Sequence, residues 1–307
     1  MQFSGNVAYT KKREWEGYLM PRTLSEALSL LEEFKGEARI IAGGTDLVVQ
    51  NRGGSMQTKG LVDITRIPGL DGITLDKDTI RIGCLVTHTK VTESLLIREK
   101  AMALSESASR LGSPQIRNMG TVAGNIVNAQ PGADTTIPLL ALDASVKVVS
   151  KGGERVIPLT ELFTGVGKTR IDSTREIVTE ISFPALRGNE SSASFRLAKR
   201  RALVLPILTV AVALSADVKK KRFNSARIAV GPVAVTPMRC TEAEKVLAGS
   251  PINEEIIRKS AATAAAAANP RTSLIRGTKE YRQAMVAILV EKAIKLALER
   301  LEGHHGQ

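Results

Sequence analysis

Two segments that lack bulky side chains constrain this chain more than any other feature of its sequence. In the first, residues 39–47 (RIIAGGTDL), an apolar run leads into two glycines; the second, residues 118–125 (NMGTVAGN), continues into PGADT at 131–135. Where bulky side chains are absent, consecutive backbone N–H groups can turn toward one anion and approach it closely. Either segment alone is typical of an ordinary glycine-rich turn. Two of them facing each other would hold a diphosphate from both sides.

The composition limits the classes of partner. The chain has 307 residues, enough for two domains, and a net charge of +12 from 43 basic and 31 acidic residues. This charge fits an anionic cofactor, an acidic partner protein or nucleic acid. The basic residues are spread along the chain, and only 3% of residues are aromatic, so stacking on bases has few side chains to use. We therefore expect no nucleic-acid partner, and a non-catalytic basic nucleic-acid-binding module stays an alternative from a different class.

Metal sites, disulfides and membrane spans are not expected. The two cysteines, Cys84 and Cys240, are fewer than the four thiolates that an iron–sulfur cluster usually takes. No spacing typical of a zinc or calcium site occurs. The longest apolar run, residues 202–214, is too short to span a bilayer, and no signal peptide is visible. These observations predict a cytoplasmic protein that binds no membrane.

Periodicity and turn signals predict both helices and strands in the first half of the chain. Thr23 and Glu26 form a capping box ahead of an apolar stripe, which predicts a helix that ends near Gly36. A short buried strand at 40–41 leads into the first glycine segment, and residues 73–82 predict a hairpin.

A change of composition at residues 184–192 predicts a domain boundary, because proline, glycine and polar residues gather there. Beyond it the sequence predicts three strands and then two long helices (194–197, 208–216, 226–230, 254–268 and 281–301).

Catalytic constellations are absent from the sequence. Residues 165–169 (GVGKT) look like the end of a nucleotide-binding P-loop, but Leu162 stands where that loop requires glycine. Of the three histidines, His304 and His305 fall in a glycine-flanked tail, and His88 is expected to be a surface or capping residue. We therefore expect no catalytic residue and no metal ligand on this chain.

The two glycine segments, in this order, resemble the flavin motifs of the FAD-binding medium subunit of the molybdenum hydroxylases, the family of xanthine dehydrogenase and carbon monoxide dehydrogenase. AGGTDL at 42–47 matches the first motif, and SPQIRNMGT at 113–121, followed by Gly124 and Asn125, matches the second. The resemblance extends from about residue 18 to about residue 300, almost the whole chain.

The resemblance implies an α+β fold in two domains. Residues 1–183 would form a two-lobed FAD-binding domain of the vanillyl-alcohol-oxidase (PCMH) type, with lobes at about 1–58 and 59–183. Residues 192–302 would form a C-terminal antiparallel sheet with packed helices, and residues 303–307 a flexible tail. FAD would lie extended between the lobes.

The resemblance also implies a set of cofactor-binding residues: Ala42, Gly43, Gly44, Thr45, Asp46, Leu47, Thr121, Gly124, Asn125, Asp134 and Lys199. Backbone N–H groups of residues 42–46 can share the charge of a diphosphate, and valine at Gly43 is expected to crowd it. Asp46 is expected to turn away from the diphosphate and accept backbone N–H bonds.

The remaining candidates have alternative roles. The amide of Asn125 and the carboxylate of Asp134 suit the hydroxyls of a ribityl chain, and Asp134 could equally cap the helix that follows it. Lys199 or Arg196 could stabilise charge on the reduced flavin ring, or belong to a solvated basic strand. Two departures from the family are Ala123, where glycine is usual, and residues 164–169, which lack a tyrosine that several relatives place against the ring.

As a function, the resemblance implies an FAD-carrying electron-transfer subunit. A molybdenum-cofactor large subunit would oxidise the substrate, and a [2Fe–2S] small subunit would relay electrons to this chain, in a dimer of heterotrimers. The FAD would pass them to an external acceptor such as NAD⁺, a quinone or oxygen. A free-standing flavin reductase of the same fold is the alternative enzyme.

Overall fold

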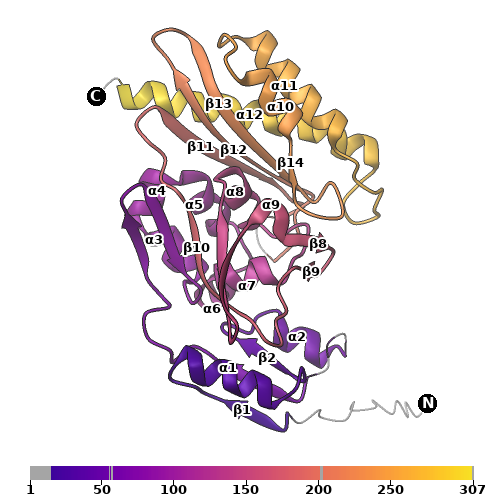
Figure 1. Ribbon diagram of the computed structural model, residues 1–307. Helices are drawn as coiled ribbons and strands as arrows, with labels where there is room; N and C mark the ends of the chain where they lie inside the picture. The colour runs from indigo at the N-terminus through magenta and orange to yellow at the C-terminus, as the bar shows by residue number, and fades with distance from the viewer. Residues whose placement is uncertain (1–14, 55, 57, 201–202, 306–307) are drawn as a thin grey trace, which may run out of the picture.

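A computed structural model describes residues 15–54, 56, 58–200 and 203–305 of the chain. A small N-terminal lobe, a middle lobe and a C-terminal domain follow one another as layers from the bottom to the top of Figure 1. The chain is therefore α+β, as the family resemblance implied.

The N-terminal lobe is a three-stranded parallel sheet with one helix packed on it. The strands β1 (Gly17–Leu19), β3 (Gly60–Asp63) and β2 (Ala38–Ile41) lie in this order. The predicted helix α1 (Leu24–Glu33) begins where the Thr23 side chain accepts a hydrogen bond from the Glu26 N–H, and it buries Ala27, Leu28 and Leu31. Because β3 lies in this sheet, residues 60–63 belong with the first lobe, beyond the boundary expected near residue 58.

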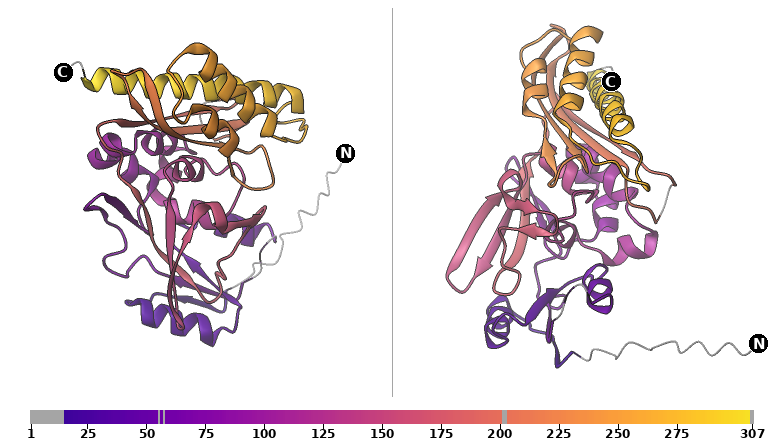
Figure 2. Two further views of the ribbon diagram at one scale, coloured as in Figure 1. Left: turned by 45° about the horizontal axis from the view of Figure 1, so that its top comes forward. Right: turned by 90° about the vertical axis from the view of Figure 1, so that its right-hand side faces the viewer.

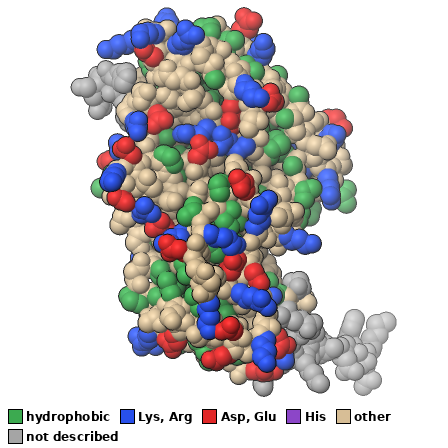
Figure 3. All heavy atoms as spheres, in the orientation of Figure 1, with side chains coloured by type: hydrophobic (Ala, Val, Ile, Leu, Met, Phe, Trp, Pro, Cys, Tyr) green, Lys and Arg blue, Asp and Glu red, His purple; other side chains and the backbone are tan. Residues whose placement is uncertain are grey.

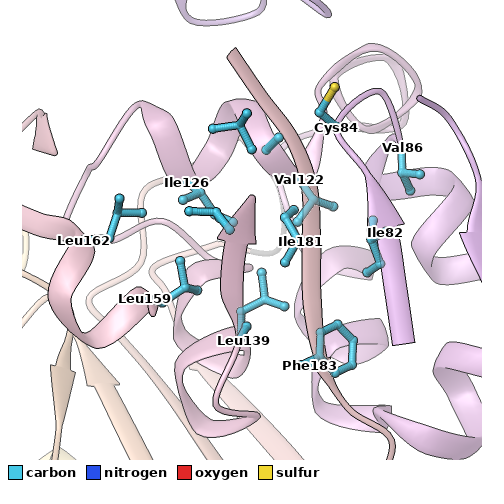
Figure 4. Packing of buried hydrophobic residues seen from close by; sticks show 14 of the residues in the cluster. Ile82, Cys84, Val86, Val122, Ile126, Leu139, Leu159, Leu162, Ile181 and Phe183 are labelled. Carbon is cyan, nitrogen blue, oxygen red and sulfur yellow. The ribbon is translucent and has the colours of Figure 1, made fainter. Parts of the chain in front are cut away.

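The middle lobe contains a five-stranded antiparallel sheet. Its order is β4 (Ile73–Asp76), β5 (Thr79–Gly83), β10 (Ile177–Pro184), β6 (Ser145–Ser150) and β7 (Gly153–Pro158). The hairpins β4–β5 and β6–β7 are local, whereas β10 arrives from far along the chain and joins them. In Figure 4, Ile82, Ile181 and Phe183 of β5 and β10 pack with Leu139 and Val122 of the helices.

Short helices cover one side of that sheet, as the right-hand view of Figure 2 shows. They are α3 (His88–Glu93), α4 (Leu95–Lys100), α5 (Met102–Ser109), α6 (Pro114–Met119), α7 (Val122–Val127), α8 (Thr136–Ala141) and α9 (Leu159–Leu162). The second glycine segment is therefore two short helices, α6 and α7, joined at Gly120 and Thr121.

Residues 165–169 span the end of β8 (Phe163–Gly165), a turn at 166–167 and the whole of β9 (Lys168–Thr169). Gly167 has a φ of 67°, which favours glycine, and no helix follows this turn directly, as one would in a P-loop. The local resemblance to a P-loop is therefore accidental.

The C-terminal domain is a four-stranded antiparallel sheet in the order β11 (Glu190–Leu197), β12 (Leu208–Asp217), β13 (Arg222–Gly231) and β14 (Met238–Arg239). The helices α10 (Thr241–Leu247), α11 (Glu254–Ala267) and α12 (Lys279–His305) pack on it. β12 alternates large and small residues: Val210 and Val212 face the helices, and Ala211 faces the middle lobe. Small residues on that face allow α5 and α8 of the middle lobe to lie against the sheet.

Four findings complete the fold. α12 continues to His305, through residues 303–305 that were expected in a flexible tail. Cys84 and Cys240 are buried and free. No group of three or more histidine, cysteine or acidic residues that could hold a metal ion occurs among the described residues. Within that same part of the chain, no helix has the length and apolar character needed to cross a membrane.

Candidate functional site

The two glycine segments line one cleft. Its volume is about 840 Å³, toward the upper end of the roughly 300–1,000 Å³ that is usual for small-molecule and cofactor sites. The turn at 164–169 and residues 203–205 complete its wall. Ten of the eleven predicted binding residues line this cleft: Ala42, Gly43, Gly44, Thr45, Asp46, Leu47, Thr121, Gly124, Asn125 and Asp134.

The first segment presents free backbone donors to the cleft. β2 ends at Ile41, and the helix α2 (Leu47–Arg52) begins directly after the segment. In the described part of the chain, the N–H groups of residues 43–46 donate to no protein acceptor. Gly44 has a φ of 67°, a conformation that other residues adopt only with strain. Four neighbouring donors without acceptors are the arrangement that an anion requires.

Gly43 is where the two segments touch. A Cβ atom built on Gly43 would lie 1.9 Å from the carbonyl oxygen of Met119 and 3.0 Å from the Cα of Gly120. The missing side chain of Gly43 therefore points at protein backbone. We expected valine at this position to crowd a diphosphate. The reason for that expectation is wrong, because the added side chain would first meet the backbone of the second segment.

The second segment is ordered by its own side chains. The Thr121 hydroxyl accepts a hydrogen bond from the Gly124 N–H at 3.0 Å, which caps α7. The Thr135 hydroxyl donates to the Asn125 Oδ1 at 2.8 Å. The amide NH₂ of Asn125 has no acceptor among the described residues, so it is the group that Asn125 can offer a ligand.

Asp134 is held by an arginine. The Arg196 Nε donates to the Asp134 Oδ1 at 2.8 Å, the Thr209 hydroxyl lies 3.3 Å from the same oxygen, and both charged side chains are buried. Burial raises the pKa of Asp134, and the guanidinium of Arg196 opposes that rise. Asp134 does not cap α8: the helix begins after Thr135, with no side-chain cap. Arg196 also donates to the Val204 carbonyl, so this pair joins the second segment to residues 203–205.

Asp46 behaves differently from the sequence expectation. Its carboxylate accepts no capping hydrogen bond, because Asp46 itself adopts a near-helical conformation (φ −100°, ψ −47°) at the start of α2. The side chain is exposed, yet neighbouring protein atoms displace part of its hydration, which raises its pKa.

Lys199 lies outside the cleft wall. Its side chain is exposed just after the end of β11, and the neighbouring Arg196 is occupied by Asp134. This position matches the alternative of a solvated basic segment, and a role beside the flavin stays a prediction.

His88 is not the surface or capping residue that the sequence predicted. It is 2% exposed, lines the cleft and lies beside Gly120, and its Nδ1 has no hydrogen-bond partner among the described residues. Burial, together with the charge of Arg117, lowers its pKa to about 4, so the imidazole is neutral. Thr87 is the residue that caps α3. The sequence carried no signal for this burial, which arises where α3 meets the loop between α6 and α7.

The donor set of the cleft fits FAD. The free N–H groups of residues 43–46 suit a diphosphate, Thr45 and Asn125 add polar groups for hydroxyls, and apolar residues form a further part of the wall. Those apolar residues are Ile40, Ile41, Met56, Leu111, Ile116, Val127, Ile171, Leu203, Val204 and Leu205.

Known proteins of one family match almost the whole chain. Residues 10–186 match the model of the FAD binding domain in molybdopterin dehydrogenase, and residues 193–297 match the CO dehydrogenase flavoprotein C-terminal domain. The chain is 32% identical to the xanthine dehydrogenase FAD-binding subunit of Escherichia coli O157:H7, over 94% of this chain and 98% of that protein. It is 35% identical to the 6-hydroxypseudooxynicotine dehydrogenase complex subunit alpha of Paenarthrobacter nicotinovorans, over 92% and 94%.

A solved structure has the same fold. It is a carbon monoxide dehydrogenase from Hydrogenophaga pseudoflava that lacks the Mo-pyranopterin moiety of its cofactor. The TM-score is 0.88 at 29% identity, over 94% of this chain and 98% of that one.

Proposed function

The chain belongs to the family of FAD-binding domains of molybdopterin dehydrogenases, and on that premise we propose that it carries electrons from an iron–sulfur partner subunit to an external acceptor. It is an oxidoreductase flavoprotein subunit, and its cofactor is FAD. Family membership establishes the cofactor and the class of enzyme. The route of the electrons and the identity of the partner subunits are the proposal.

One observation carries the proposal. The two glycine segments, remote in sequence, touch at Gly43 and Met119, and beside this contact the N–H groups of residues 43–46 have no protein acceptor. Backbone donors of this kind are fixed in place by the fold, so they bind a diphosphate without the reorganisation that water would need.

The chain's own residues hold and enclose the cofactor. Residues 43–46 would hold the diphosphate, and the Asn125 amide and the Thr45 hydroxyl would bind neighbouring oxygens. The Asp134–Arg196 pair positions residues 203–205, which form the wall on the side of the C-terminal domain. FAD supplies the chemistry, because it accepts electrons singly and releases them in pairs. This transfer needs no protein acid or base, which agrees with the absence of a catalytic constellation in the sequence.

We propose partners of two kinds. A molybdenum-cofactor large subunit oxidises the substrate, and a [2Fe–2S] small subunit relays the electrons, in a dimer of heterotrimers in the cytoplasm. Support comes from relatives whose names describe them as FAD-binding subunits, medium chains or parts of a complex.

The test is purification of the tagged full-length chain from its native host. We expect the visible absorption of a flavin, FAD released on denaturation, and iron and molybdenum in the same fraction. Flavoprotein without iron or molybdenum would favour the free-standing flavin reductase. Colourless protein that binds DNA, with an affinity that falls steeply with salt, would favour the basic nucleic-acid-binding module.

A further inference from the structure

One surface beside the cleft is built to meet another protein. It consists of the described residues of three connections at the same end of the C-terminal sheet: 198–200 and 203–207 between β11 and β12, 232–237 between β13 and β14, and 268–278 between α11 and α12. Five large apolar side chains on these connections are more than half exposed: Leu203 (61%), Leu205 (66%), Val235 (52%), Leu274 (103%) and Ile275 (69%). Exposed apolar residues scattered singly need no explanation, but a group on adjoining loops is typical of an interaction site.

A buried arginine ties these connections together. Arg282, in the first turns of α12, is 3% exposed and donates to the carbonyl oxygens of Ile207, Pro232 and Arg271, one on each connection. The Asn269 N–H also donates to the Val233 carbonyl at 3.0 Å. No carboxylate in the described part of the chain pairs with Arg282, and burial lowers its pKa. The charge of Arg282 is therefore used to hold three loops in one arrangement.

The most exposed tip is held by hydrogen bonds within its own turn. Ser273 and Gly277 exchange two backbone hydrogen bonds, of 2.9 and 3.0 Å, and the Ser273 hydroxyl accepts from the N–H groups of Ile275 and Arg276. This turn leaves the side chains of Leu274 and Ile275 in water. A preorganised apolar tip loses little conformational entropy on binding, which is the property of an interface anchor.

The charges around this surface select the partner. The described parts of the connections carry four cations and no carboxylate: Lys199, Arg200, Arg271 and Arg276. In Figure 3, hydrophobic side chains lie among lysine and arginine side chains at the right-hand edge, over the loop that precedes α12. A second copy of this chain, with its net charge of +12, would be repelled, whereas an acidic protein surface would be attracted.

Position narrows the partner further. Leu203 and Leu205 belong both to this surface and to the cleft wall, so a protein bound here lies beside the FAD. We propose that the surface formed by these three connections docks the iron–sulfur subunit, through an acidic face with an apolar pocket for Leu274 and Ile275. This assignment rests on the proposed function.

The test compares two variants of the tagged chain, purified with its partners from the native host. In Leu274→Asp/Ile275→Asp we expect unchanged FAD content and association with the iron-containing subunit weakened at least about 30-fold, the loss typical of a hot-spot residue. The readouts are iron per flavin and partner retention by native mass spectrometry. Leu95→Asp is the matched control, since Leu95 is 70% exposed on α4, away from the surface.

Each outcome separates the two proposals. A wild-type chain without FAD or without iron sinks the proposed function itself. A wild-type chain that holds both, with a double variant that also keeps its iron, overturns only the docking surface. Loss of FAD from the double variant would assign these residues to the cleft instead. Concentration-dependent dimers of the purified chain that the double variant abolishes would assign the surface to a second copy.

Discussion

Replacing Gly43 by alanine should separate the two segments that form the cleft. The added Cβ would start 1.9 Å from the Met119 carbonyl oxygen, and ordinary contact begins near 3.4 Å, so one backbone must move by the difference, 3.4 − 1.9 = 1.5 Å. Overpacking of this kind costs about 1–3 kcal/mol of folding stability. Hydrogen bonds from backbone N–H groups tolerate only a few tenths of an ångström around 2.9 Å. Loss of one bond to a charged oxygen costs about 1.5–3 kcal/mol, so we expect FAD affinity to fall at least about tenfold.

The assay for Gly43→Ala is FAD content after gel filtration, followed by titration of the apoprotein with FAD and by thermal unfolding. Gly72→Ala is the control, because a Cβ at Gly72 would meet nothing within 4 Å. The control should keep FAD affinity and unfolding temperature. Wild-type affinity in Gly43→Ala would refute the reasoning, since it would show that the contact with Met119 does not set the geometry of the donors.

Three further predictions follow from the charged groups around the cleft. His88 has a folded pKa of about 4, against ~6.5 for an exposed imidazole, so the unfolded chain binds its proton first as the pH falls. Between pH 6.5 and pH 4, the free energy of unfolding of the wild type should therefore fall by about 3 kcal/mol more than that of His88→Phe. Urea unfolding at the two pH values measures this difference. Asp134→Asn should lower the free energy of unfolding by about 3–5 kcal/mol, because it leaves Arg196 buried without its charged partner. In the same urea experiment, the double variant Asp134→Asn/Arg196→Met should lose less than the sum of the losses of the two single variants. Lys199→Ala should keep FAD and lower its reduction potential; an unchanged potential would place Lys199 in the solvated surface.

The elements that the sequence predicted are those fixed by local interactions. The helix α1 follows from the Thr23 cap and its apolar stripe, and the hairpin β4–β5 from two short runs around a turn. The strand β10 went unpredicted although it is central, because its partners β5 and β6 lie far away in sequence. Local pattern carries no information about such pairing.

The candidate site divides in the same way. The residues of the glycine segments were found through their resemblance to the flavin motifs of the family, and ten of the eleven candidates line one cleft. The partners of the side chains were not found, because they are set by tertiary packing: Asp134 pairs with Arg196 from another domain, and His88 is buried by the loop after α6. The prediction that the Asp46 carboxylate accepts backbone N–H bonds was wrong for a local reason, because the backbone of Asp46 adopts a near-helical conformation at the start of α2.

The wall of the cleft sets an order of events during biosynthesis. Its residues span the chain from Arg39 to Leu205, and the arginine that ties Leu205's connection in place comes later still, at residue 282. When only the first glycine segment has left the ribosome, the chain contains only one of the two segments that form the cleft. Flavin loading therefore has to wait until nearly the whole polypeptide has been synthesised, and chains truncated before α12 should emerge colourless.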